Sequence, residues 1–152
     1  MILQPGITSF YSLGEWIPQF GLTEFKRIVF GVATSLSYIV ADVTESGVVP
    51  NFHSALLSKN DESILVVGNS IFPVFAFADP SKSGYLHLEF IDAKALAQRF
   101  SELFPDVTVG STSELNRKLN DEDLKELGPA DLSQFDHWEP KTVGDVVFNW
   151  WD

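Results

Sequence analysis

The sequence predicts a single α+β domain spanning residues 1–152, in which a mostly antiparallel meander of strands packs against two to four helices. Short runs of β-branched and aromatic residues, separated by turn residues, fill the middle of the chain. Apolar residues at helical spacing dominate the last third. The sequence shows no repeat, low-complexity tract or long linker. A chain of 152 residues can bury roughly two thirds of its unfolded surface in one core.

The first 25 residues combine breakers of regular structure with large aromatic side chains. The breakers are Pro5, Gly6, Gly14, Pro18 and Gly21. The large apolar side chains between them are Phe10, Tyr11, Trp16, Ile17 and Phe20. This composition predicts an irregular or briefly helical aromatic segment that folds onto the body of the domain.

Residues 27–43 fit two interpretations. Apolar residues alternate at Ile28, Phe30 and Val32, and again at Leu36, Tyr38 and Val40, which predicts two strands. A helix fits almost as well, because a period of 3.6 residues connects Val32, Leu36, Ile39, Val40 and Val43. The choice between strands and helix therefore stays open. Residues 44–47, Thr-Glu-Ser-Gly, are typical of a turn.

Three further apolar runs predict consecutive strands of the meander, at residues 54–58, 63–68 and 71–78. Pro73 cannot donate a ladder hydrogen bond, which places the third run at a sheet edge or at a bulge. Residues 85–91 alternate cleanly after a loop, with Leu86, Leu88 and Phe90 on one face. They predict a further strand.

Helical spacing governs the residues after this strand. Asp92 can cap a helix over residues 93–104, whose apolar positions recur at helical spacing until Pro105 ends it. The short β-branched run at residues 106–109 predicts a strand.

Two capping signals then predict shorter helices. Residues 111–114, Ser-Thr-Ser-Glu, have the spacing of a capping box and predict a second helix. Asn120 can begin another helix, which Gly128 and Pro129 should end.

The last sixteen residues hold three of the four tryptophans. Thr142 can cap a C-terminal helix with Asp145 three residues on. Its apolar stripe would contain Val143, Val146, Val147, Trp150 and Trp151, and would dock on the body because so short a helix is marginal alone. Its opposite face would carry Asp145, Asn149 and Asp152. The tryptophans are expected to fill the core, with Trp151 the more exposed of the terminal pair.

The charge of the chain limits its partners. The sequence contains 21 acidic and 10 basic residues, a net charge of −11. This charge disfavours nucleic acids and anionic membranes and favours a basic protein partner. Residues 113–152 hold ten acidic and four basic residues, a net of −6, so the C-terminal region is the acidic pole. The same acids could also form only a solvated surface that keeps the protein soluble.

Composition also indicates the compartment. The chain has no cysteine, which excludes disulfides and thiolate metal sites and is compatible with the cytoplasm. No apolar run approaches the roughly 20 residues of a membrane span. We expect a cytoplasmic protein that does not enter a membrane.

No motif in the sequence predicts catalysis or a bound cofactor. His87-Leu88-Glu89 matches the H-x-E fragment of zinc deaminases, but that site also needs cysteine ligands. A metal site using His53 with His87 and Glu89 is conceivable, although strand alternation produces such pairs routinely. The common phosphate-binding glycine motifs are missing. We therefore expect no catalytic residues, no metal and no cofactor.

The end of the chain follows the pattern W-x-P-x-x-V-G-x-x-x-F-N-x-W-D, from Trp138 to Asp152. In this stretch, about fifteen residues long, the sequence resembles small acidic bacterial immunity-type proteins of toxin systems. The resemblance implies a cytoplasmic inhibitor that neutralises a toxin domain by stoichiometric binding. Strong negative charge would suit such an inhibitor, because acidic side chains can capture a basic partner quickly.

The candidate partner-binding residues are polar groups of the C-terminal third. They are Asp121, Glu122, Asp123, Glu126, Asp131, Asp136, Asp145, Asn149 and Asp152. Two alternatives remain open: a structural or regulatory subunit that docks through its C-terminal aromatic helix, and an enzyme with a dispersed histidine and carboxylate site. The sequence does not indicate the oligomeric state.

Overall fold

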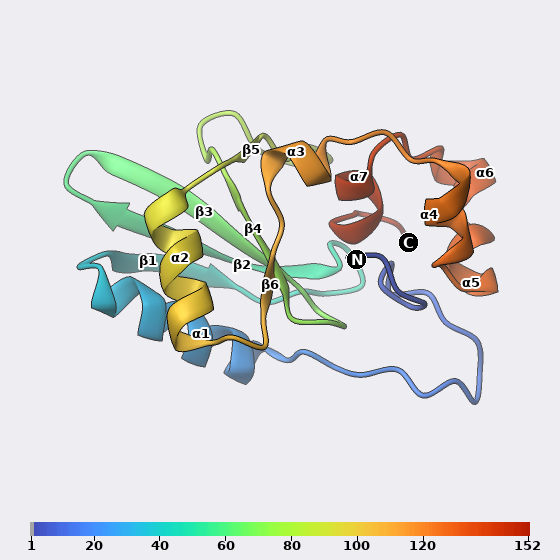
Figure 1. Cartoon of the computed structure of the whole chain (residues 1–152), viewed down its shortest axis with the longest axis horizontal. Coiled ribbons are helices and arrows are strands. Elements are labelled where there is room, and N and C mark those ends of the chain that lie inside the picture. The colour runs from blue at the N-terminus through green and yellow to red at the C-terminus, as the bar shows by residue number, and fades with distance from the viewer. Residues whose placement is uncertain (1) are drawn as a thin grey trace.

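Antiparallel pairing of successive strands organises the computed structural model, which describes residues 2–152 (Figure 1). The sheet order is β1–β2–β3–β4–β5, and β6 pairs in parallel with β4. The strands are β1 (Ile39–Thr44), β2 (Phe52–Lys59), β3 (Glu62–Asn69), β4 (Val74–Ala78), β5 (Phe90–Ile91) and β6 (Thr108–Val109). The predicted α+β class and the meander are confirmed.

The described residues form two longer helices and five short ones. The longer helices are α1 (Leu22–Ser35) and α2 (Lys94–Leu103). The short helices are α3 (Thr112–Leu115), α4 (Asp121–Lys125), α5 (Pro129–Leu132), α6 (Phe135–Trp138) and α7 (Val143–Val147). In Figure 1, α4 to α7 lie together at one end of the molecule, beside both termini. The expected two to four helices are therefore exceeded by helices of about one turn.

Residues 27–43 divide between the two interpretations, so each was wrong for half of the segment. Residues up to Ser35 belong to α1, because Phe25, Ile28, Val29 and Val32 recur at helical spacing and are buried. The alternation at residues 28–32 does not form a strand, since Phe30 points to the exposed side of the helix. Residues 39–44 form β1.

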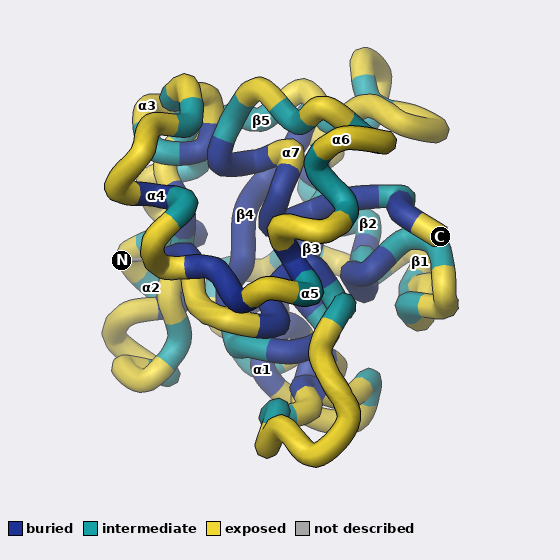
Figure 2. Tube along the Cα trace, turned by 90° about the vertical axis from the view of Figure 1, so that its right-hand side faces the viewer, coloured by how far each residue is buried: buried dark blue, intermediate teal, exposed yellow. Residues whose placement is uncertain are grey.

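The two faces of the sheet have separate cores. On one face, α1 and α2 bury an aromatic cluster that includes Phe25, Phe75 and Phe100. On the other face, Phe52 and Val74 pack against segments from both ends of the chain. Figure 2 shows this buried centre surrounded by exposed loops. The second core is the one that bears on the functional surface.

The predicted strand over residues 85–91 was largely wrong. Only Phe90–Ile91 forms a strand, β5. Gly84 and His87 instead exchange two backbone hydrogen bonds in a tight turn, with N···O distances of 2.9 and 3.2 Å. Leu86 within this turn has φ +67°, which ends the two-residue alternation of side chains. Tyr85 and Leu86 are therefore exposed at a loop tip.

Two neighbouring predictions also need correction. Asp92 does not cap α2; its carboxylate accepts hydrogen bonds from the backbone N–H and the hydroxyl of Thr112, at the start of α3. Pro73 precedes β4 and that strand is interior, between β3 on one side and β5 and β6 on the other. The Pro73 carbonyl accepts a hydrogen bond from Thr108 N–H, so the proline sits where no donor is needed.

Three buried asparagines, Asn51, Asn69 and Asn149, form what we call the asparagine clasp. The side-chain amides of Asn51 and Asn69 both donate to the backbone carbonyls of Ile7 and Val147, at 2.8–3.2 Å. The Asn51 side-chain oxygen accepts from Asn149 N–H at 2.8 Å. The clasp thus joins the beginning and the end of the chain to the sheet.

The Asn149 side chain completes the clasp. Its amide donates to the carbonyls of Thr8 and Val146, and its oxygen accepts from Trp151 N–H at 3.1 Å. Helix α7 ends at Val147, so the predicted polar stripe of Asp145, Asn149 and Asp152 does not form. Asn149 lies in the core instead.

The exposure of the terminal tryptophans is the reverse of the prediction. Trp151 is only 6% exposed and stacks on Trp138, with ring centroids 6.4 Å apart. Trp150 is half-buried and faces outward. The helix start at Thr142, with its capping box to Asp145, is confirmed.

The helix that begins after Asn120, α4, ends at Lys125, before Gly128 and Pro129, and a separate helix, α5, begins at Pro129. Asp131 of α5 is fully buried and accepts hydrogen bonds from the N–H groups of Gly6 and Gly128 and from the Thr8 hydroxyl. The N-terminal segment is therefore held by one carboxylate as well as by the clasp.

Within residues 2–152, no helix has the length and apolar character that crossing a membrane requires.

We predict that deletion of residues 146–152 abolishes cooperative unfolding, as measured by thermal denaturation with circular dichroism. The deletion removes Val146, Val147, Phe148 and Trp151 from the core, each contributing about 1.5–3 kcal/mol, against a total stability of about 5–15 kcal/mol. Deletion of the exposed Asp152 alone should leave the melting curve unchanged. A truncated chain with an intact cooperative transition would contradict this prediction.

Candidate functional site

The nine predicted partner-binding residues do not form one surface. Six are exposed: Asp121, Glu122, Glu126, Asp136, Asp145 and Asp152. Three are buried and engaged within the chain: Asp123, Asp131 and Asn149. These three are inaccessible to a partner, so their place in a binding site was wrong. Sequence spacing identified them as polar but could not show that they fold inward.

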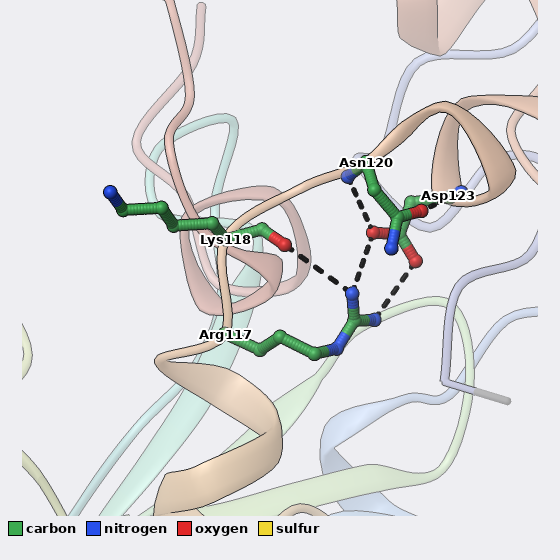
Figure 3. Close-up of polar contacts among 4 residues, drawn as sticks. All are labelled: Arg117, Lys118, Asn120 and Asp123. Atoms are coloured by element: carbon green, nitrogen blue, oxygen red, sulfur yellow. Dashed lines mark hydrogen bonds and ion pairs between the residues drawn. The ribbon is translucent and has the colours of Figure 1, made fainter.

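The buried carboxylate of Asp123 has both of its oxygens engaged in hydrogen bonds within the chain. Its carboxylate accepts from both terminal nitrogens of Arg117, at 2.8 and 2.9 Å, and from Asn120 N–H at 2.9 Å (Figure 3). These hydrogen bonds, with Arg117 contributing most, hold the pKa of Asp123 below its ordinary value although burial opposes them. The pair joins the segment after α3 to the start of α4.

The exposed acids are themselves divided. Asp121, Glu122 and Glu126 belong to or follow α4, where Glu122 forms an ion pair with Lys125 at 3.2 Å. Asp145 and Asp152 lie near the C-terminus, and Figure 2 shows α4 and the C-terminus on opposite sides of this end of the molecule. Asp145 also caps α7 by accepting from the N–H groups of Lys141 and Thr142. Together these acids create a negative field rather than a single patch.

A different group of residues has the character of a binding surface. Tyr85 is 78% exposed and Leu86 is 56% exposed, at the tip of the loop between β4 and β5. The Tyr85 ring meets the half-buried Trp150 ring edge to face, with centroids 6.4 Å apart. We call Tyr85, Leu86, Trp150 and two of the hollows beside them, described next, the Trp150 surface.

The first hollow, of about 350 Å³, lies between the uncovered part of the sheet and the Tyr85 loop. Phe52, Leu56 and Leu65 contribute apolar side chains from β2 and β3, and Tyr85 and Trp150 contribute aromatic rings. The second hollow, of about 220 Å³, lies between Leu86, Trp138 and Trp150. Because both hollows border Trp150, a single partner could fill them together.

The charges around the Trp150 surface have one sign. Asp42 lines the first hollow, and Glu139 and Asp145 line the second. Neither hollow is lined by lysine or arginine. Large aromatic side chains with acidic groups beside them are suited to a partner that presents both apolar and basic side chains.

Of the three histidines, His137 is exposed on α6, and the other two lie on separate parts of the fold. His53 is buried, accepting from Ser46 N–H at its Nδ1 atom and contacting the Phe20 carbonyl oxygen through Nε2 at 2.7 Å. His87 lies 3.4 Å from Glu89 on an exposed loop. Among residues 2–152, no group of three or more histidine and acidic side chains is placed to hold a metal ion. His53 has the environment of a structural residue.

The candidate residues did not include Asp42, although the spacing of the valines around it indicates where its side chain points. Val40 and Val43 both pack toward α1 and α2, although they are three residues apart in a strand. A two-residue period requires one extra residue between them, which predicts a β-bulge. That bulge places Asp42 on the opposite face. Tyr85 and Leu86 had no comparable signal, because their alternation imitates a strand.

The C-terminal sequence pattern has a structural basis in this chain. Val143, Phe148 and Trp151 lie in the core, and Asn149 belongs to the asparagine clasp. A Cβ atom at Gly144 would lie 2.6 Å from a ring carbon of Phe90, so a larger residue would require the ring to move. Trp150, which forms the binding surface, occupies a variable position of the pattern.

No family model, curated protein or solved structure matches the chain. Its class is defined by its fold and surface: an α+β domain with an acidic surface and a preformed aromatic surface beside its C-terminus.

We predict that Asp123→Asn lowers the free energy of unfolding by about 1–2 kcal/mol at pH 7, because it weakens charge-assisted hydrogen bonds. The depressed pKa of Asp123 means that its carboxylate stabilises the fold above its unfolded pKa of about 4, and that this contribution is lost as pH falls through the folded value. The stability difference between wild type and variant should therefore narrow below about pH 4.

Urea denaturation at several pH values between 3 and 7 would measure this difference. Asp121→Asn is the matched control, since Asp121 is an exposed residue of the same helix. A difference that stayed constant down to pH 3 would show that the Arg117 pair is not its source.

Proposed function

We propose that this protein is a cytoplasmic protein-binding module that neutralises a basic partner, such as a toxin domain, by stoichiometric association in the manner of an immunity protein. The observation that carries the proposal is the Trp150 surface: exposed and half-buried aromatic side chains beside two preformed hollows, with only acidic side chains among the charged residues that line them.

The aromatic residues would provide most of the binding energy. Binding hot spots are enriched in tryptophan and tyrosine, because these side chains bury large areas and lose little conformational entropy. Trp150 is already fixed by contacts with Phe52 and Tyr85, at centroid distances of 5.3 and 6.4 Å. A partner would therefore meet an ordered surface, which reduces the entropic cost of binding.

The charge of the protein would accelerate the encounter. A net charge of −11 attracts a basic domain over distances near the Debye length, about 8 Å at physiological ionic strength. The acids of α4 lie away from the Trp150 surface and would act through this long-range field. Asp42, Glu139 and Asp145 would act at close range, where they can pair with basic side chains of the partner.

The two alternative functions find less support. A subunit that docks through the apolar stripe of its C-terminal helix needs that stripe free, but Val143, Val146 and Val147 are buried in this chain's own core. An enzyme with a dispersed site would bring several histidines and carboxylates together in one hollow, whereas His53 is buried in the core and the hollow of about 160 Å³ beside His87 holds a single carboxylate, that of Asp145. The absence of cysteine fits the reducing cytoplasm.

We predict that Tyr85→Ala/Leu86→Ala increases the dissociation rate of the partner at least tenfold, because hot-spot truncations cost about 2 kcal/mol or more. The partner would be captured from the native host, identified, purified and measured by surface plasmon resonance. The matched control is Tyr11→Ala/Leu13→Ala, which truncates exposed residues on the N-terminal loop. Equal dissociation rates for the two double variants would argue against the Trp150 surface as the binding site.

We predict that Asp121→Lys/Glu122→Lys/Glu126→Lys slows association several-fold at low salt and leaves dissociation nearly unchanged, because these exposed acids contribute only to steering. The effect should fade near 1 M salt, where the Debye length is about 3 Å. Stopped-flow association kinetics at two salt concentrations would measure it. Association that does not respond to the charge reversal would exclude electrostatic capture by this face.

A further inference from the structure

We propose that the 350 Å³ hollow of the Trp150 surface receives an arginine side chain of the partner, with the guanidinium group paired to Asp42 and in contact with the aromatic rings of Tyr85 and Trp150. This inference rests on the proposed function and names the chemical group that the surface recognises. It follows from three features: a bulge in β1, the aromatic walls of the hollow, and an unpaired carboxylate.

The bulge in β1 aims Asp42 into the hollow. Val40 pairs with Leu57 and Asp42 pairs with Leu56, so Ala41 is the extra residue. Without the bulge, Asp42 would point to the same face as Val40, where α1 and α2 cover the sheet. With it, Asp42 lies beside Leu56 on the opposite face, at its uncovered part, and both residues line the hollow. Bulges commonly re-aim side chains in this way next to functional sites.

The walls of the hollow suit a flat cation with an aliphatic stem. Leu56 and Leu65 are paired neighbours on β2 and β3 and provide an apolar floor for methylene groups. Trp150 meets Phe52 at an interplanar angle of 89° and Tyr85 at 76°, so rings of different orientation border the space. Aromatic faces carry negative potential and attract a cation placed over them.

The Asp42 carboxylate, which is the charged group of the hollow, pairs with no side chain of the described residues. Among residues 2–152, no hydrogen bond or ion pair involves the Asp42 carboxylate, and Asp42 is the single charged residue that lines this hollow. Within the part of the chain that the structure describes, the cation–π contacts are elsewhere, with Lys59 over Tyr38 and Arg27 over Phe104. A basic side chain from outside would therefore gain both an ion pair and aromatic contacts.

Arginine fits these features better than lysine. The guanidinium group is planar, so it can stack on an aromatic ring while two of its N–H groups face a carboxylate. It is also more weakly hydrated than an ammonium group, which lowers the cost of entering a partly apolar hollow. Lysine would present a compact, strongly hydrated charge to the same walls.

Titration of the intact protein with Nα-acetyl-arginine methylamide, followed by 1H–15N NMR, tests this proposal without the partner. The indole N–H of Trp150 reports on the hollow directly, and the indole N–H of Trp16, on the exposed N-terminal loop, is an internal reference. Nα-acetyl-citrulline methylamide is the matched neutral probe, and Nα-acetyl-lysine methylamide tests the preference for a planar cation.

The arginine probe should shift the Trp150 resonance in a saturable manner, and the citrulline probe should shift it at least threefold less at equal concentration. Asp42→Asn and Tyr85→Ala should each weaken arginine binding about two- to fivefold, the weight of one such contact at a partly exposed site. Asp61→Asn and Tyr11→Ala are the matched controls, because both alter exposed residues that do not line the hollow. These controls should bind as wild type does.

Three results would overturn the proposal: equal shifts with arginine and citrulline, tighter binding of the lysine probe, or unchanged arginine binding in Asp42→Asn. The proposed function is tested separately from the arginine site. If the partner still depends on Tyr85 and Leu86 while the arginine probe does not bind, the hollow recognises another group and the protein-binding function stands. If the arginine probe binds but the dissociation rate of the partner is unchanged in Tyr85→Ala/Leu86→Ala, the Trp150 surface is not the site of the proposed protein-binding function.

Discussion

The asparagine clasp is the constraint on which the rest of this structure depends. The segments around Ile7 and after Val147 have no regular secondary structure, so their backbone carbonyl and N–H groups need partners from outside any helix or strand. Asn51, Asn69 and Asn149 supply them from buried positions. An unpaired buried amide or carbonyl costs about 1–3 kcal/mol, so a clasp that satisfies several such groups specifies one arrangement of both chain ends.

The clasp also determines where the functional surface lies. Beyond α7 the backbone becomes extended, with φ −123° and ψ 96° at Phe148. In an extended segment successive side chains point to opposite sides, so Asn149 and Trp151 lie on one side and Phe148 and Trp150 on the other. On that second side both rings contact Phe52, with Phe148 buried and Trp150 half-buried at the surface. The outward position of Trp150 is thus a consequence of fixing Asn149. Because Asn149 and Trp151 hold the segment in place, the ring of Trp150 between them lies at the surface.

Local signals in the sequence predicted much of the fold and little of the site. The meander, the helix start at Asn120 and the capping box at Thr142 depend on residues within a few positions of one another, and they were confirmed. The role of Asn149 depends on Thr8, which is 141 positions away, and no local pattern contains that information. The strand prediction over residues 85–91 was wrong for the opposite reason: its alternation was genuine, but the left-handed turn at Leu86 interrupts it.

Stability does not account for the exposed side chains of the Trp150 surface. Tyr85 and Leu86 lie outside both hydrophobic cores, and the Asp42 carboxylate makes no hydrogen bond within the described residues. The bulge at Ala41 interrupts the β1–β2 ladder, and a bulge at the sheet edge discourages pairing with another strand. Edge protection explains the bulge alone. It does not explain why the re-aimed side chain is a carboxylate that lines an open hollow together with two aromatic rings, and recognition of a cationic side chain explains all three features together.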